Sequence, residues 1–369
     1  MIDDNQHSYV KYLPVLKWRQ GEYQALLRLD KSIKKLLYPL FVIPPVEYDF
    51  EEQKPKKTAE EHVEKLARRY WDKWGALPCL LDIDPSLHLD SVKDGRTIPE
   101  FIFDEISSIG GHFSPVIHLD YDVSYIRAVK KTYCDRSYGI GIRVSLDELA
   151  DPSSYNKIEQ LLIQIGCNSH EVDLIVDFRK GANYKPTEDV VCMTSTLLGV
   201  IPKIATYRSI YVIGTSLELE MVKKPGAEQE RDDWAFYKQL HSALKADFPN
   251  LGFGDYTVET PDFTSLDMRM MKPAAKLVYS YEDKWLVYKG GSFRDNPSQM
   301  KTLCNSLISS PHNYFYGKNF SPGDKKISDC STGACGTGNL STWKEASISH
   351  HLTLVVSQIA NLNGSQKLP

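Results

Sequence analysis

The chain has 369 residues, of which 42% are hydrophobic and 25% are charged, and its formal net charge is −4. This composition is typical of a soluble globular protein, and the charge excludes a global attraction to nucleic acid while leaving a local basic patch open. No run of about 18 apolar residues exists and the N-terminus MIDDNQHSYV has no apolar segment, so we expect neither a membrane span nor a signal peptide. The seven cysteines are odd in number and suit a reducing compartment, so a cytoplasmic protein without a membrane partner is expected.

Eight strand-like apolar runs fill most of the chain, and each is followed by a segment with helical spacing. In chain order the runs are Tyr9–Trp18, Leu37–Pro45, Leu77–Asp84, Phe113–Asp122, Gly139–Ser145, Val172–Phe178, Ser209–Ser216 and Leu251–Thr257. Strands that alternate with helices indicate βαβ units, and eight such units predict an α/β protein with a closed (β/α)8 barrel of the TIM type.

The region after the eighth run breaks this alternation. It contains a hairpin-like pattern at Leu277–Tyr288, a short helix at Pro297–Ile308 and a polar, glycine-rich loop at Pro311–Asn339. A final helix is predicted at Thr342–Leu362, with Thr342 and Glu345 as a capping box like that of Thr58 and Glu61. We therefore expect residues 1–257 and 341–363 to form the barrel, and residues 258–340 to form an inserted lid over its mouth.

Charged side chains gather near the ends of the predicted strands, where barrel proteins place their chemistry. Carboxylates two residues apart on neighbouring strands are suited to general acid–base work or to a hard divalent cation. The predicted catalytic residues are Asp82, Asp120 and Asp177, and the predicted metal ligands are Asp82, Asp84 and Asp120. Arginine and lysine pair with phosphate or carboxylate, and the predicted ligand-binding set is Lys17, Arg19, Arg143, Arg179 and Asp255.

Other readings of these residues remain open. Charged rings at barrel ends also form structural ion-pair networks in proteins that perform no reaction. His350 and His351 are adjacent on the last helix, about 100° apart, so one is expected to pack and the other to face solvent. The stretch DCSTGACGTGN lacks a second ligand pair for zinc and the lysine of a P-loop, so a flexible loop is expected there.

The sequence also resembles a known family. The opening YLPVLKWRQGEYQAL, the strand ends PLFVIPP and LPCLLDID, and the closing GTGNLSTWKEASISHHLTLVVSQIANL are similar to the Beta protein family over nearly the whole chain. That family occurs in bacteriophages, prophages and bacterial genomes, so the resemblance implies a function in a phage or in the conflict between phage and host. It transfers no activity and no catalytic residues.

Two functions follow as expectations. The first is the binding of a small anionic ligand, such as a nucleotide or a nucleic-acid end, at the barrel mouth in a phage or phage-defence setting. This function extends to a metal-dependent phosphoester hydrolase with a divalent metal as cofactor. The second is a non-catalytic recognition or adaptor module that binds a protein partner in an antiphage or counter-defence complex. Whether the chain is an enzyme stays open at this point.

Overall fold

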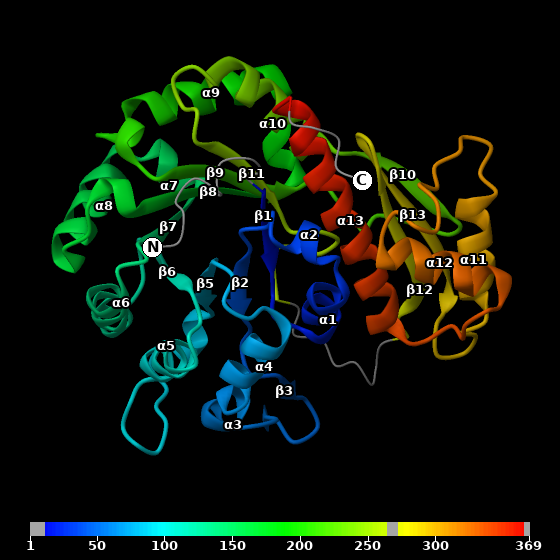
Figure 1. The fold of residues 1–369 in the computed structure, drawn as a ribbon, viewed down its shortest axis with the longest axis horizontal. Coiled ribbons are helices and arrows are strands. Elements are labelled where there is room, and N and C mark those ends of the chain that lie inside the picture. The colour runs from blue at the N-terminus through cyan, green and yellow to red at the C-terminus, as the bar shows by residue number, and fades with distance from the viewer. Residues whose placement is uncertain (1–11, 264–271, 365–369) are drawn as a thin grey trace.

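A computed structural model describes residues 12–263 and 272–364, and its centre is a closed barrel of eight parallel strands (Figure 1). The strands, in chain order, are β1 (Tyr12–Leu16), β2 (Leu40–Ile43), β5 (Cys79–Ile83), β6 (Phe113–His118), β7 (Ile140–Ser145), β8 (Val172–Lys180), β9 (Ser209–Thr215) and β11 (Leu251–Asp255). Each expected apolar run coincides with one strand, which confirms the predicted (β/α)8 class. Residues 9–11 of the first run lie outside the described part of the chain.

The barrel closes where β1 pairs with both β2 and β11. The strands are buried on both faces, because one face meets the barrel interior and the other meets the helices. Small and branched apolar side chains fill the interior, among them Val15, Val42, Leu80 and Ile175. The barrel is therefore a packed core whose chemistry is restricted to its ends.

Helices surround the barrel as the alternation predicts (Figure 1). They are α1 (Gln20–Arg28), α2 (Lys31–Lys34), α3 (Ala59–Val63), α4 (Leu66–Lys73), α5 (Ile98–Ser108), α6 (Val123–Arg136), α7 (Leu146–Ala150), α8 (Pro152–Ile165), α9 (Thr187–Val200) and α10 (Asp232–Leu244). The capping box expected at Thr58 is present: its hydroxyl accepts from the Glu61 amide, and the Glu61 carboxylate accepts from the Thr58 amide.

A smaller, three-stranded antiparallel sheet lies beside the barrel. Its order is β10 (Gly226–Glu230), β13 (Lys284–Ser292) and β12 (Ala274–Tyr281), so the expected hairpin is present with one additional strand. Helices α11 (Gln299–Ile308) and α12 (Pro322–Thr332) pack on this sheet. The glycine-rich region was expected to be a flexible loop throughout; α12 occupies part of it, because Ile327 and Cys330 are buried in a second core.

The last helix, α13 (Leu340–Leu362), separates the barrel from the small sheet (Figure 1). Its side chains enter two cores: Ile348 and Leu352 belong to the barrel core, and Trp343 and Ala346 belong to the second core. Its N-cap is Asn339, which forms the capping box with Thr342, so the box predicted for Thr342 and Glu345 is wrong. The reason is that the helix begins two residues earlier than its apolar spacing indicates.

The segment after β11 therefore stands mainly at the side of the barrel, and β12 with the first turns of α13 borders the mouth. Its role as a lid over the mouth stays a prediction. A two-stranded hairpin, β3 (Tyr48–Asp49) and β4 (Lys54–Pro55), borders the mouth from the side of β2. Across residues 12–263 and 272–364, no helix has the length and apolar character needed to cross a membrane.

Candidate functional site

Half of the barrel mouth, over β5 to β8, is filled by a buried charge network. Strand alternation turns Asp82, Arg143 and Asp177 into the interior. Arg143 Nη2 donates to Asp177 Oδ2 at 2.7 Å, and Arg143 Nη1 donates to Asp82 Oδ2 at 3.2 Å. The hydroxyl of Tyr256 lies 2.6 Å from both Arg143 Nη2 and Asp177 Oδ2. The structure thus brings together one predicted ligand-binding residue and two predicted catalytic residues at one end of the barrel.

The Asp82 carboxylate has little capacity left for a ligand. Its Oδ2 also meets His118 Nε2 at 2.9 Å, and its Oδ1 accepts from the Tyr121 hydroxyl at 2.8 Å. Burial alone raises the pKa of Asp82, but the charge and hydrogen bond of His118 and the charge of Arg143 outweigh burial, so the pKa is lowered. His118 is the more accessible member, with 28% of its side chain exposed. This arrangement agrees with the alternative that these charged side chains form a structural ion-pair network.

The structure does not assemble the predicted metal set. Asp84 accepts a hydrogen bond from the Ser86 amide at 3.0 Å and begins a short 3-10 helix. Asp120 is exposed in the turn after β6, two residues beyond its last residue, His118. Among the described residues, no group of three or more histidine, cysteine, aspartate or glutamate side chains is placed to hold a metal ion.

Asp255 also lies away from the mouth. Its side chain points outward from β11, where Oδ1 accepts from the Tyr12 hydroxyl and Oδ2 meets His351 Nε2, each at 2.8 Å. The prediction that one of the two histidines faces solvent is wrong, because both are 0% exposed between the barrel and the small sheet. His350 instead meets Asp324 Oδ2 and the Ser280 carbonyl, each at 2.8 Å. This second network joins the barrel to the small sheet.

Two predicted anion-binding cations, Lys17 and Arg179, meet at Asp262 in the loop after β11. Lys17 Nζ donates to the Asp262 carbonyl at 2.5 Å, and the Asp262 carboxylate pairs with Arg179 and with Lys180, the latter at 3.0 Å. Burial lowers the pKa of Lys17 to about 8, with nearby Glu259 opposing the shift. Lys17, Arg179 and Lys180 therefore surround Asp262, which contributes a single negative charge.

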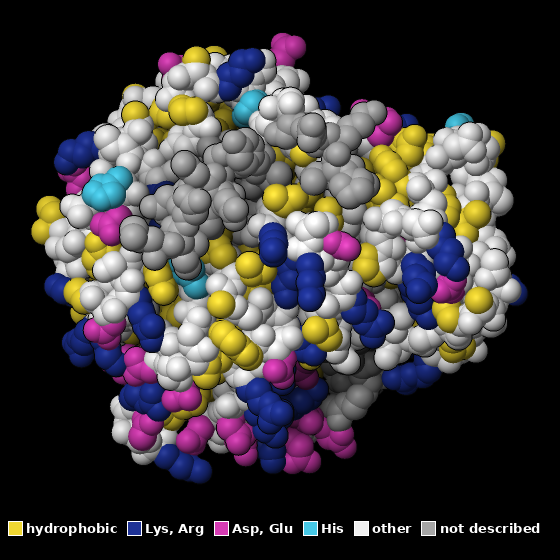
Figure 2. Space-filling view, in the orientation of Figure 1, with side chains coloured by type: hydrophobic (Ala, Val, Ile, Leu, Met, Phe, Trp, Pro, Cys, Tyr) yellow, Lys and Arg dark blue, Asp and Glu magenta, His cyan; other side chains and the backbone are white. Residues whose placement is uncertain are grey.

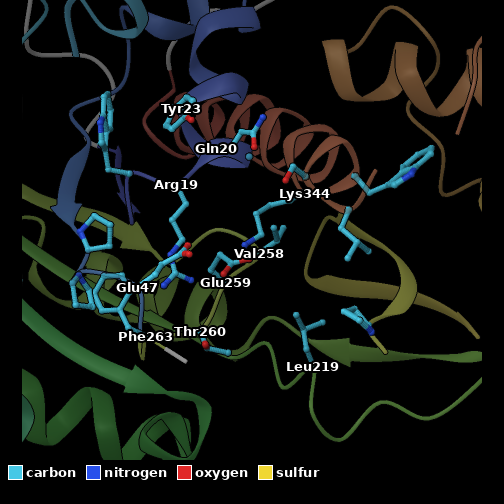
Figure 3. A pocket seen from close by; sticks show the side chains of 18 of the residues that line it. Arg19, Gln20, Tyr23, Glu47, Leu219, Val258, Glu259, Thr260, Phe263 and Lys344 are labelled. Carbon is cyan, nitrogen blue, oxygen red and sulfur yellow. Dashed lines mark ion pairs between the residues drawn. The ribbon is translucent and has the colours of Figure 1, made fainter. Parts of the chain in front are cut away.

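The other half of the mouth, over β9, β11, β1 and β2, holds an open cleft of about 1020 Å³. We call it the mouth cleft, and its outer wall is formed by β12 and the first turns of α13. Figure 3 shows Arg19 pointing from the end of β1 toward Phe263 and Glu47, and Lys344 reaching from α13 toward Glu259. Gly21 makes room for this lysine, because a Cβ at that position would lie 2.8 Å from the Lys344 side chain.

The cations of the mouth cleft fall into two groups. Lys344 and Lys56 are neutralised, because they pair with Glu259 at 2.7 Å and with Glu47 at 2.8 Å. Arg19, Arg69 and Lys276 form no ion pair with a carboxylate of the described chain. Arg19 lies over the Phe263 ring at 5.2 Å and Arg69 over the Tyr23 ring at 5.4 Å.

Lys276 is partly buried. Burial, and then repulsion from Lys289, lower its pKa, while the charge of Glu259 opposes the shift. A partly buried cation that forms no salt bridge among the described residues favours the entry of an anion.

Sequence reasoning found Arg19 but missed Arg69, Lys276, Lys344 and the aromatic side chains of the cleft. Lys276 and Lys344 come from β12 and α13, whose approach to the mouth depends on how the small sheet packs, whereas Arg69 comes from the barrel helix α4. Only weak features of the sequence point to these residues. Lys344 lies in the segment GTGNLSTWKEASISHHLTLVVSQIANL, which carries part of the family resemblance, and Arg69 lies on the polar side of a predicted helix.

Acid is expected to destabilise the protein through Asp82 and Asp255. The pKa of each is lowered in the folded state, for Asp255 by the charge and hydrogen bond of His351 against the opposing effect of burial. Their stabilising contribution is therefore present above the unfolded value of about 3.9, and it is lost as the pH falls through the folded pKa. Urea midpoints measured from pH 7 to pH 3 should fall most steeply below about pH 5.

The variant Asp82→Asn should flatten this pH dependence, whereas Asp120→Asn should leave it unchanged because Asp120 is exposed. An Asp82→Asn curve parallel to that of the wild type would show that the network does not contribute in this way.

The profile of the Beta protein family matches residues 12–357, nearly the whole chain. The chain belongs to the Beta protein family. This finding confirms the resemblance seen in the sequence. No curated protein matches this member of the family.

Solved structures similar to this Beta protein family member are TIM-barrel enzymes. A type I 3-dehydroquinate dehydratase from Clostridium difficile is 11% identical, with a TM-score of 0.39, and the match covers 70% of this chain and 88% of the other. A GH5-4 endoglucanase from an uncultured bacterium is 10% identical, with a TM-score of 0.39 and coverage of 68% and 86%. A 3-hexulose-6-phosphate synthase from Salmonella typhimurium is 13% identical, with a TM-score of 0.34 and coverage of 69% and 92%. At these identities the likeness concerns the fold alone.

Proposed function

We propose that the chain binds an anionic, phosphate-bearing ligand, a nucleotide or a nucleic-acid end, in the mouth cleft. The observation that supports this most is the set of three cations, Arg19, Arg69 and Lys276, which line one cleft and form no salt bridge among the described residues. Glu47 and Glu259 attract Arg19 and Lys276 only from beyond salt-bridge distance. Hydrogen bonds between charged groups are about twice as strong as neutral ones, so phosphate oxygens would gain most from these side chains.

The surroundings of Asp262 support the same class of ligand. Its carboxylate holds Arg179 and Lys180 as a ligand anion would, and its carbonyl holds Lys17. Phe263, the next residue, lines the mouth cleft and also lies under Arg19. The two groups of cations thus face one continuous region of the mouth.

Binding is better supported than metal-dependent phosphoester hydrolysis. Asp82 and Asp177 are the two predicted catalytic residues at the mouth, and both are occupied by Arg143. Of the other two predicted metal ligands, Asp84 accepts a hydrogen bond from the Ser86 amide, and Asp120 is exposed in the turn after β6. Hydrolysis would need a metal or a general base supplied by a rearrangement of this network.

The substitution Arg19→Met is expected to weaken the binding of pyrophosphate and of ATP about tenfold or more. The reason is that a hydrogen bond between the arginine and a charged phosphate contributes about 1.5–3 kcal/mol to binding. Isothermal titration calorimetry of the wild type and of Arg19→Met measures this change. Arg136→Met is the matched control, because Arg136 is exposed at the end of α6, at the opposite end of the barrel. Equal affinities for the two variants, or no binding by the wild type, would contradict the proposal.

A second candidate function is recognition of a protein partner in phage–host conflict. It is favoured by the hydrogen-bonded network over β5 to β8, in which Arg143 engages both Asp82 and Asp177 and His118 engages Asp82. Phage plating on cells that express the wild type or Arg19→Met separates the two functions. Loss of an effect in Arg19→Met supports a role for the ligand, and an unchanged effect supports partner recognition by another surface.

A further inference from the structure

The mouth cleft continues outward onto the face formed by the β3–β4 hairpin, α3 and α4. A second hollow of about 400 Å³ is lined by Lys56, Lys57, Glu61, His62, Glu64, Lys65 and Arg69. Three of these residues, Lys56, His62 and Arg69, line the mouth cleft as well. The two hollows therefore form one path from the barrel mouth to the outer surface.

The outer end of this path is locally basic although the chain is acidic overall. Four lysine and arginine residues and two glutamates line the second hollow, and because Lys56 is paired with Glu47, a local excess of one positive charge remains against a net charge of −4 for the chain. Figure 2 shows lysine and arginine side chains gathered around α3 and the β3–β4 hairpin, with acidic side chains between them. One of the glutamates, Glu61, accepts the hydrogen bond from the Thr58 amide, so part of its charge is already engaged.

Aromatic rings alternate with these cations. Tyr48 and Phe50 on the hairpin line the mouth cleft and are 42% and 40% exposed, with their ring centroids 5.2 Å apart. Farther along the path, Tyr23 lies beneath Arg69 and Phe263 lies beneath Arg19. Large aromatic side chains that are exposed next to each other at a cleft are typical of a binding surface.

The size of the path leaves room for more than a single nucleotide. Pockets for single small molecules span about 300–1,000 Å³. The mouth cleft alone reaches about 1020 Å³, and the second hollow extends it. A groove with basic residues for phosphates and aromatic faces for bases is the arrangement that single-stranded nucleic acid uses.

We infer that the path binds a single strand of nucleic acid, with its bases against Tyr48, Phe50 and Tyr23 and its phosphates near Arg69 and Arg19. This inference rests on the proposed function and extends it from a phosphate-bearing ligand to a polymer. Because stacking on aromatic rings tolerates any base, the binding has little sequence preference. A duplex hides its base faces and binds more weakly.

Fluorescence anisotropy of the full chain with 5′-fluorescein-labelled (dT)4, (dT)8, (dT)12 and (U)12 tests the inference. Affinity should rise with length until the path is filled, and a 12-base-pair duplex should bind at least tenfold more weakly than (dT)12. Comparison of (dT)12 with (U)12 decides which type of strand is preferred, and a rise of affinity with length across the DNA series supports the inference.

Two sets of variants place the strand on the path. The double variant Tyr48→Ala/Phe50→Ala should weaken (dT)12 binding about tenfold or more, because each stacked base contributes substantially to affinity. Arg69→Met should weaken binding and reduce the slope of log affinity against log salt by about 0.7, the change for one lost phosphate contact on a single strand. Arg68→Met is the matched control, since Arg68 lies on the same helix with 88% of its side chain exposed and lines neither hollow.

The outcomes separate the inference from the proposed function. Pyrophosphate and dTMP binding that is lost in Arg19→Met, together with affinity that does not grow with strand length, would overturn the inference and leave the proposed function in place. No binding of any of these probes by the wild type would overturn both. Equal losses in Arg69→Met and Arg68→Met would show that the strand binds elsewhere.

Discussion

Replacing Arg143 with methionine is expected to lower the free energy of unfolding by about 3–5 kcal/mol, because it leaves Asp82 and Asp177 buried without their shared counter-ion. Among the residues that the structure describes, Arg143 is the one cation that contacts both carboxylates, and the Tyr256 hydroxyl loses a partner as well. Urea unfolding at pH 7, followed by circular dichroism, measures the loss. The effect should shrink at low pH, where protonation of the Asp82 carboxylate removes part of the uncompensated charge.

Arg127→Met is the control for this prediction, since Arg127 is exposed on α6 and surface substitutions usually change stability by less than about 0.5 kcal/mol. A loss below about 1 kcal/mol in Arg143→Met would mean that water or a rearranged side chain compensates the carboxylates. The network would then be open to ligands, and hydrolysis at the mouth would regain support.

Replacing His351 with leucine is expected to cost a similar amount, about 3–5 kcal/mol, because Asp255 is fully buried and loses its partner on α13. The Ser280 hydroxyl on β12, which lies 3.0 Å from His351 Nδ1, loses a partner too. Hydrogen exchange should therefore report faster opening of β12 as well as lower global stability. His170→Leu serves as the control, since His170 is exposed.

A double-mutant cycle with Asp255→Leu sharpens this second prediction. Removing both members leaves no unpaired carboxylate, so the double variant should lose less stability than the sum of the two single variants. Strict additivity would show that the two side chains do not stabilise the fold through each other.

The barrel strands were predictable because each is a short apolar run between polar segments. The edge strand β10 was not predictable from its sequence GAEQE, since its only described strand partner is β13 and its side chains are largely outside the core. The glycine-rich stretch hid α12 for a similar reason: only Ile327 and Cys330 signal its buried side. Helix α12 exists because the small sheet offers these residues a surface.

The candidate site was predictable in part. Asp82, Arg143 and Asp177 were selected because they lie near strand ends, and the structure turns all three into the barrel interior because they lie within the strands. Asp120 lies beyond the end of β6, where strand alternation no longer fixes the direction of a side chain. The outward direction of Asp255 could not be predicted, because a barrel strand is buried on both faces and its apolar pattern does not reveal which face is inward. The outer wall of the mouth cleft depends on contacts between distant segments, which no local pattern encodes.

The position of α13 has a consequence for the order in which the molecule can be assembled. This helix contributes Ile348 and Leu352 to the barrel core and Trp343 and Ala346 to the second core. It is also synthesised after every other described element that it contacts. On the ribosome, all eight barrel strands and the small sheet emerge with apolar surface still uncovered, and neither core is complete until residues 340–362 have left the exit tunnel. The nascent chain therefore completes its two cores together, only after residues 340–362 have emerged.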